Sequence, residues 1–132
     1  MRSVLSMGLL IAASFTAVGC GERNCQSTCQ KVYGASECAV SIEGESPEES
    51  IDTCLDRCET ALQKAGDICV DKGGKEECYD PSRNYPASDP PELENEKWAA
   101  AWMDCVWDLA PVDGYSKGCE SLQLGTQCAP TR

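Results

Sequence analysis

Two stretches of the chain decide its fold, CQSTC at residues 25–29 and CLDRC at residues 54–58. In each stretch two cysteines stand four positions apart, which is slightly more than one turn of an α-helix. Side chains at that spacing lie on the same face of a helix. The sequence therefore predicts two helices, each of which carries a pair of sulfur atoms on one face.

Local signals set the limits of both helices. Asn24 suits the N-cap and Gly34 the end of a helix over residues 25–33. Ser46, followed by Pro47 and then Glu49, forms a capping box for a second helix over residues 47–65. The second helix also carries an apolar stripe at helical spacing, formed by Ile51, Cys54, Leu55, Cys58, Ala61 and Leu62.

A third helix is predicted over residues 90–110. Asp89 suits its N-cap, Pro90 its first position and Pro111 its end. The apolar side chains of this segment cover an arc of about 200° when they are placed at the helical angle per residue. An arc that wide exceeds the apolar face of an ordinary surface helix. We therefore expect this helix to lie centrally in the domain.

All three tryptophans of the chain, Trp98, Trp102 and Trp107, lie on this helix. The main interpretation is that they form the core of a chain that has few other aromatic residues. The alternative is that Met103 and Trp107 stay exposed at one edge as a binding patch, because exposed aromatic residues are typical hot spots.

The segments between the helices read as connections, over residues 35–46, 66–89 and 112–132. They hold Cys38 in the first, Cys69 and Cys78 in the second, and Cys119 and Cys128 in the third. We expect at most one helical turn in the last segment, around residues 115–122. The predicted fold class is all-α, a small disulfide-rich three-helix domain with long crosslinked loops.

The twin Cys-x3-Cys pattern of residues 25–58 resembles the helical hairpin of the small mitochondrial intermembrane-space chaperones. In that family two antiparallel helices are joined first cysteine to fourth and second to third. The resemblance implies the bonds Cys25–Cys58 and Cys29–Cys54 here. The pairing of the other six cysteines stays open, and the combination that we favour is Cys69–Cys78, Cys119–Cys128 and Cys38–Cys105.

The first 19 residues have the features of an export signal. Arg2 is followed by an uncharged apolar run over residues 4–18, about 15 residues long, whereas a membrane-spanning helix needs about 20. The run ends in Ala17-Val18-Gly19-Cys20, which resembles the lipobox of bacterial lipoproteins. The resemblance implies cleavage after Gly19, a diacylglycerol on the Cys20 sulfur and an acylated new N-terminus. The alternative is an ordinary signal peptide.

Residues 20–24 would then form a lipidated N-terminus with a short tether, and residues 25–132 a disulfide-stapled helical domain. The number of cysteines agrees with this division. The chain has 11, an odd number, and lipidation of Cys20 would leave ten that can pair completely. Such a density of cysteine is typical of an oxidising compartment, which in a bacterium is the periplasm or the cell surface.

Charge and composition exclude several function classes. The formal net charge of −11 disfavours binding to nucleic acid, which depends on basic side chains. The chain has no histidine, and therefore lacks the most common general base and zinc ligand. We expect no catalytic residues, no metal and no cofactor.

The predicted function is that of a membrane-anchored, cysteine-rich envelope lipoprotein with a structural or protein-interaction role and no catalysis. The alternative is a ligand-binding or inhibitor-like module that uses the Trp-rich helix 90–110. The expected partners are the membrane, through the lipid anchor, and an envelope protein. Gly21 differs from the aspartate that retains many such lipoproteins in the inner membrane, so the resemblance favours the outer membrane.

Overall fold

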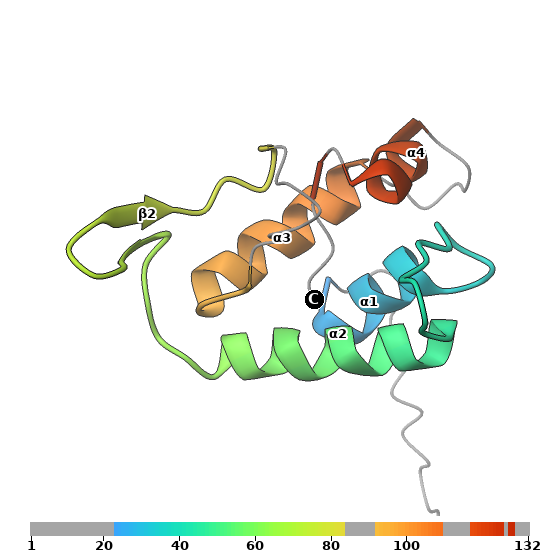
Figure 1. Ribbon diagram of the computed structural model, residues 1–132, viewed down its shortest axis with the longest axis horizontal. Coiled ribbons are helices and arrows are strands. Elements are labelled where there is room, and N and C mark those ends of the chain that lie inside the picture. The colour runs from blue at the N-terminus through green and yellow to red at the C-terminus, as the bar shows by residue number, and fades with distance from the viewer. Residues whose placement is uncertain (1–22, 84–91, 110–116, 126, 129–132) are drawn as a thin grey trace, which may run out of the picture.

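The computed structural model describes residues 23–83, 92–109, 117–125 and 127–128. Within these residues the chain forms four helices and one two-stranded antiparallel sheet (Figure 1). The elements follow one another as α1 (Cys25–Tyr33), α2 (Pro47–Leu62), β1 (Cys69–Asp71), β2 (Glu76–Cys78), α3 (Glu96–Leu109) and α4 (Lys117–Leu124).

Both predicted caps are present at the starts of α1 and α2. Asn24 Oδ1 accepts a hydrogen bond from Ser27 N at 2.8 Å. Ser46 N donates to Glu49 Oε2 at 2.8 Å, and Ser46 Oγ accepts from Glu49 N, so the predicted capping box is confirmed. Helix α1 has the predicted limits, and α2 ends at Leu62, three residues earlier than predicted.

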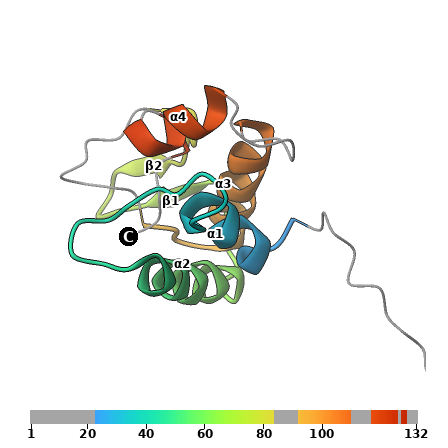
Figure 2. The ribbon, with the colours of Figure 1, turned by 90° about the vertical axis from the view of Figure 1, so that its right-hand side faces the viewer.

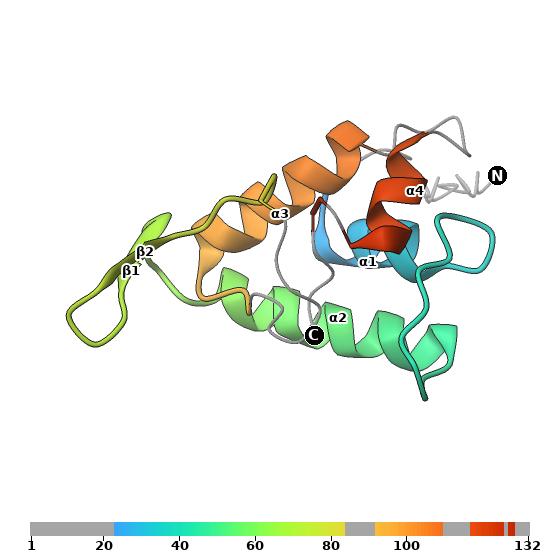
Figure 3. The ribbon, with the colours of Figure 1, turned by 45° about the horizontal axis from the view of Figure 1, so that its top comes forward.

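Two disulfide bonds join α1 to α2, which run antiparallel and side by side (Figures 1 and 3). Cys25 bonds to Cys58 with a Cα–Cα distance of 5.7 Å, and Cys29 bonds to Cys54 with a distance of 5.9 Å. These are the two bonds that the resemblance implies. All four cysteines are buried, so the crosslinks lie in the interface between the helices.

Helix α3 begins at Glu96, whereas the sequence predicted a start at residue 90; Asp89 and Pro90 lie outside the described residues. Asn95 Oδ1 accepts hydrogen bonds from Lys97 N at 3.0 Å and Trp98 N at 3.2 Å, which makes Asn95 the cap. Its Nδ2 donates to Asp67 O at 2.9 Å. A contact with a residue distant in sequence therefore fixes the start of α3.

The predicted loop over residues 66–89 contains a β-hairpin that the sequence analysis missed. Cys69 pairs with Cys78 in the register and is bonded to it, as expected. Gly73 and Gly74 have positive φ angles in the turn, and Asp71 Oδ1 accepts a hydrogen bond from Gly74 N at 2.6 Å. The hairpin projects from the helical part of the molecule (Figures 1 and 3).

The tail also holds more structure than one turn, because Lys117–Leu124 forms the helix α4. Cys119 bonds to Cys38, and Cys128 bonds to Cys105. The expected pairs Cys38–Cys105 and Cys119–Cys128 are therefore wrong.

Two contacts explain these bonds. Gln123 Nε2 donates to Cys38 O at 2.7 Å, which holds α4 against the segment between α1 and α2. Cys128 N donates to Pro81 O at 2.9 Å, and Cys105 Sγ lies 3.6 Å from the same carbonyl oxygen. The described fold is thus mostly helical and disulfide-rich, but the sheet and α4 correct the predicted all-α, three-helix class.

The core lies between the helices. Figure 2 shows α1, α2 and α3 clustered together, with α4 on the side away from α2. The largest fully buried side chains include Trp98, Trp102, Tyr33 and Leu122. Tyr79, just after the hairpin, stacks on Trp98 with ring centroids 4.8 Å apart, so the chain leaving the hairpin is packed onto α3.

Candidate functional site

The tryptophan-bearing helix contributes mainly to the core. Trp98 and Trp102 are buried, as the main interpretation expected, and Met103 is only 8% exposed. Trp107 is half-buried; its Nε1 donates to Thr28 Oγ1 at 3.0 Å, and Lys31 Nζ lies 4.8 Å from its ring centroid. The predicted exposed patch is therefore wrong for Met103, whereas the side chain of Trp107 stays partly exposed and contacts α1.

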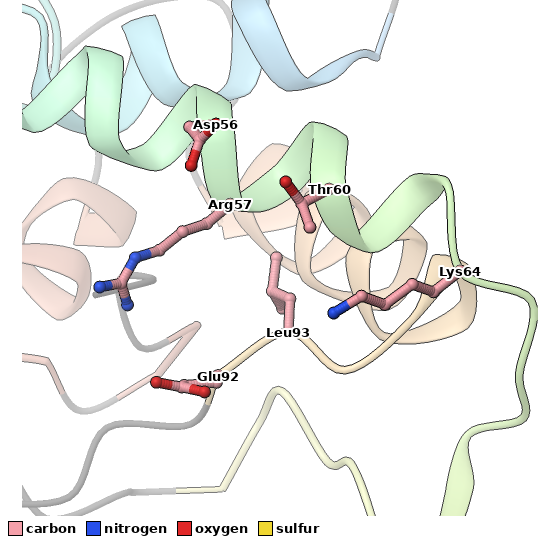
Figure 4. A pocket seen from close by; sticks show the side chains of 6 residues that line it. All are labelled: Asp56, Arg57, Thr60, Lys64, Glu92 and Leu93. Atoms are coloured by element: carbon pink, nitrogen blue, oxygen red, sulfur yellow. The ribbon is translucent and has the colours of Figure 1, made fainter.

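A small cavity lies beside α2, at the segment that leads into α3 (Figure 4). Its volume is about 190 Å³. Figure 4 shows Arg57 and Thr60 extending from α2 and Lys64 from the segment just after it, with Leu93 between Arg57 and Lys64 and Glu92 on the opposite wall. Asp56 completes the lining. Leu93 is 9% exposed and forms an apolar floor, whereas the polar side chains around it are exposed.

The two basic groups of this cavity have no anionic partner among the described residues. Neither Arg57 nor Lys64 takes part in an ion pair or a side-chain hydrogen bond there. Asp56 and Glu92 also lack an ion pair within the described part of the chain. The sequence analysis missed this site, although Arg57 and Lys64 are basic residues seven positions apart in the otherwise mainly acidic helix predicted over residues 47–65.

A second hollow, of about 340 Å³, lies along α3. Its lining is mainly apolar, but Asp104 and Asp108 stand at it, and both carboxylates bind Arg23. Arg23 Nη1 donates to Asp104 Oδ1 at 2.8 Å, and Nη2 donates to Asp108 Oδ1 at 3.3 Å. The hydrogen bond to Asp104, aided by the charge of Asp108, raises the pKa of Arg23.

A second set of ion pairs holds the hairpin to the start of α3. Lys72 Nζ lies 2.7 Å from Glu94 Oε1 and 3.5 Å from Glu77 Oε2, and it stands 5.5 Å from the ring centroid of Trp98. The hydrogen bond to Glu94 is the main cause of the raised pKa of Lys72. These ion pairs have a structural role, because they connect the hairpin to the residues just before α3.

One group of potential metal ligands comes together in the described residues, namely Cys69, Glu76 and Cys78 on the hairpin. The two cysteines are bonded to each other. Metal binding by cysteine requires the thiolate, so this group is a crosslink and offers no metal site in the oxidised protein.

The predicted lipidation residue Cys20, with the signal before it, lies outside the described residues. The described helices are all too short or too polar to cross a membrane. Comparisons of the chain with protein-family models, with curated proteins and with solved structures found no match.

Proposed function

We propose that the chain is the precursor of a bacterial envelope lipoprotein with a structural or protein-interaction role and no catalytic activity. In this proposal the signal is removed after Gly19 and Cys20 carries the lipid. The mature domain is then held at a membrane, with the outer membrane favoured by Gly21. Attachment through more than one acyl chain would make the anchoring stable.

The observation that carries the proposal is the complete pairing of the other cysteines. The described disulfides use ten of the 11 cysteines of the chain. No cysteine of the described residues is left to bond with Cys20. Cys20 follows the predicted export signal and needs no disulfide partner, which supports the interpretation that it is the lipidated cysteine of a lipobox. Five disulfides are in turn typical of a protein in an oxidising compartment.

The position of Arg23 sets how close to the membrane a lipid on Cys20 would hold the domain. Arg23 follows Cys20 by three residues and is bound to Asp104 and Asp108 on α3. Three extended residues reach about 11 Å at most. A lipid on Cys20 would therefore hold the α3 face close to the bilayer, with little room for a stalk.

The titratable side chains give no reason to propose catalysis. Among the described residues, the groups with shifted pKa values are Arg23, Glu49, Lys72 and Asp80. Each of these groups is engaged in an ion pair, a helix cap or a turn. Shifted groups of this kind are commonly structural. Asp80 does accept a hydrogen bond from the Ser82 hydroxyl, but it accepts one from Ser82 N as well, as in a turn, and its lowered pKa makes it a weaker base.

Intact-protein mass spectrometry of membrane-extracted protein tests the proposal. The expected mass lacks residues 1–19, includes the lipid, and gains ten alkyl labels only when the protein is reduced before alkylation. The variant Cys20→Ser is the control, because it should leave the membrane fraction while it keeps the same ten labels after reduction. An unlipidated native protein with a free thiol at Cys20 would overturn the proposal.

A further inference from the structure

We propose that the cavity formed by Arg57, Thr60, Lys64 and Leu93 binds a single carboxylate group. The proposal adds a binding site to the function proposed above, in which the protein meets an envelope partner. It does not depend on the lipid, because every residue that carries it lies in the described domain.

The first argument is the lack of partners for the two cations. Acidic residues outnumber basic ones by 22 to 11 in this chain. Among the described residues, Arg23 and Lys72 each pair with two carboxylates, whereas Lys75 and Lys97 have no ion pair. Arg57 and Lys64 likewise lack an ion pair in this part of the chain, and they differ from Lys75 and Lys97 in lining the same cavity. Their donors are therefore available to an external acceptor.

The second argument is the type of donor. The guanidinium of Arg57 presents a planar set of N–H groups that matches the two oxygens of a carboxylate. Lys64 adds a second positive charge from the other side of Leu93, and the methyl group of Thr60 points toward Leu93 between the two cations (Figure 4). The apolar floor at Leu93 suits the carbon that bears the carboxylate.

The third argument concerns the charge that the cavity tolerates. Two cations and the two acids Asp56 and Glu92 leave its lining neutral, while the whole chain carries a net charge of −11. A single negative charge is therefore repelled less here than over most of the surface. A dianion such as phosphate gains no net attraction from a neutral lining but costs more to remove from water, which favours a carboxylate.

The fourth argument is size. The cavity volume of about 190 Å³ lies below the range of about 300–1,000 Å³ that is usual for small-molecule pockets. The space suits one side-chain-sized group. The carboxylate could come from a glutamate or aspartate of a protein partner or from a small free carboxylic acid.

Nuclear magnetic resonance of the nitrogen-15-labelled mature protein, in an uncharged detergent, tests the site. Sodium acetate is titrated at constant ionic strength against sodium chloride, and sodium phosphate is titrated separately. We expect a saturable shift of the Arg57 Nε–H signal with acetate, no such shift with chloride, and weaker binding of phosphate. The variants R57Q and K64Q should each weaken acetate binding by about tenfold, which corresponds to the loss of one charge-assisted contact.

The variant K75Q is the matched control, because Lys75 lies in the hairpin turn and has no part in the cavity. It should bind acetate as the native protein does. A terminally blocked glutamate-rich peptide identifies the source: tighter binding than acetate indicates a protein partner, and equal affinity indicates a free acid. Shifts that rise linearly with acetate, or that persist unchanged in both R57Q and K64Q, would overturn the proposal. Neither result depends on whether Cys20 is lipidated.

Discussion

The two bonds between α1 and α2 form nested loops, and we predict that their contributions to stability are not additive. Cys29–Cys54 closes a loop with a sequence separation of 25, inside the separation of 33 that Cys25–Cys58 closes. Each bond is removed alone, by the substitutions C25A/C58A or C29A/C54A, and both bonds are removed together in a third variant.

The chain-entropy model gives the magnitudes. Alone, the inner bond would stabilise the domain by about 3.5 kcal/mol and the outer bond by about 3.7 kcal/mol. Once the inner bond exists, the outer bond closes a further loop of only about eight residues, which contributes about 2.5 kcal/mol. Both bonds together therefore contribute about 6 kcal/mol. Removing either one alone should cost about 2.2–2.5 kcal/mol, and removing both should exceed the sum of the single losses by about 1 kcal/mol.

Urea unfolding of the oxidised mature protein measures these values, with mass mapping to show that the other bonds are intact. Replacing the buried sulfurs by alanine also removes packing contacts, but that loss enters the single and the double variants alike and cancels from the coupling. Single losses of about 3.5 kcal/mol or more that add up to the double loss within about 0.4 kcal/mol would refute the nested-loop reasoning.

Three further outcomes are expected. Limited reduction followed by alkylation should label Cys69 and Cys78 first, because Cys78 is exposed and Cys69 partly exposed; peptide mapping that finds a buried cysteine labelled earlier would contradict this. The hydrogen bond from Ser46 N lowers the pKa of Glu49, so its stabilising effect should be present above about pH 4.3 and be lost as the pH falls through the lowered pKa. Urea unfolding between pH 5 and pH 2 should therefore show a smaller acid loss for Glu49→Gln than for the native protein. Trp107→Phe should cost about 1 kcal/mol in the same assay by removing the indole donor, and an unchanged stability would argue against that hydrogen bond.

The sequence predicted the parts of the fold that depend on neighbouring residues. The caps at Asn24 and Ser46 act within one helical turn, so local patterns were sufficient to place α1 and the start of α2. The start of α3 could not be found in this way. The segment from Asp89 carries a plausible cap signal, but Asn95 provides the cap and is held by Asp67, 28 positions earlier.

The same distinction explains the disulfides and the candidate site. Cys69–Cys78 spans nine positions and was predicted, but Cys119–Cys128 has the same spacing and was wrong, so short spacing alone does not select the pair. The observed bond Cys38–Cys119 spans 81 positions and depends on the packing of α4, which has a weak sequence signal. The cavity lies between α2 and Leu93, and Leu93 is far from α2 along the chain. No local pattern could show that these residues meet or that Arg57 has no acidic partner within the residues that the structure describes.

The candidate cavity lies between elements that the described disulfides do not connect. The described disulfides join α1 to α2, the segment after α1 to α4, α3 to the tail, and the two strands to each other. None of them joins α2 to α3, so noncovalent contacts set the spacing between these helices in the described part of the chain. Those contacts include Glu96 N to Lys64 O at 2.9 Å and the buried Leu93. The proposed carboxylate site therefore lies at a helix interface that, in the described part of the chain, is held without a disulfide.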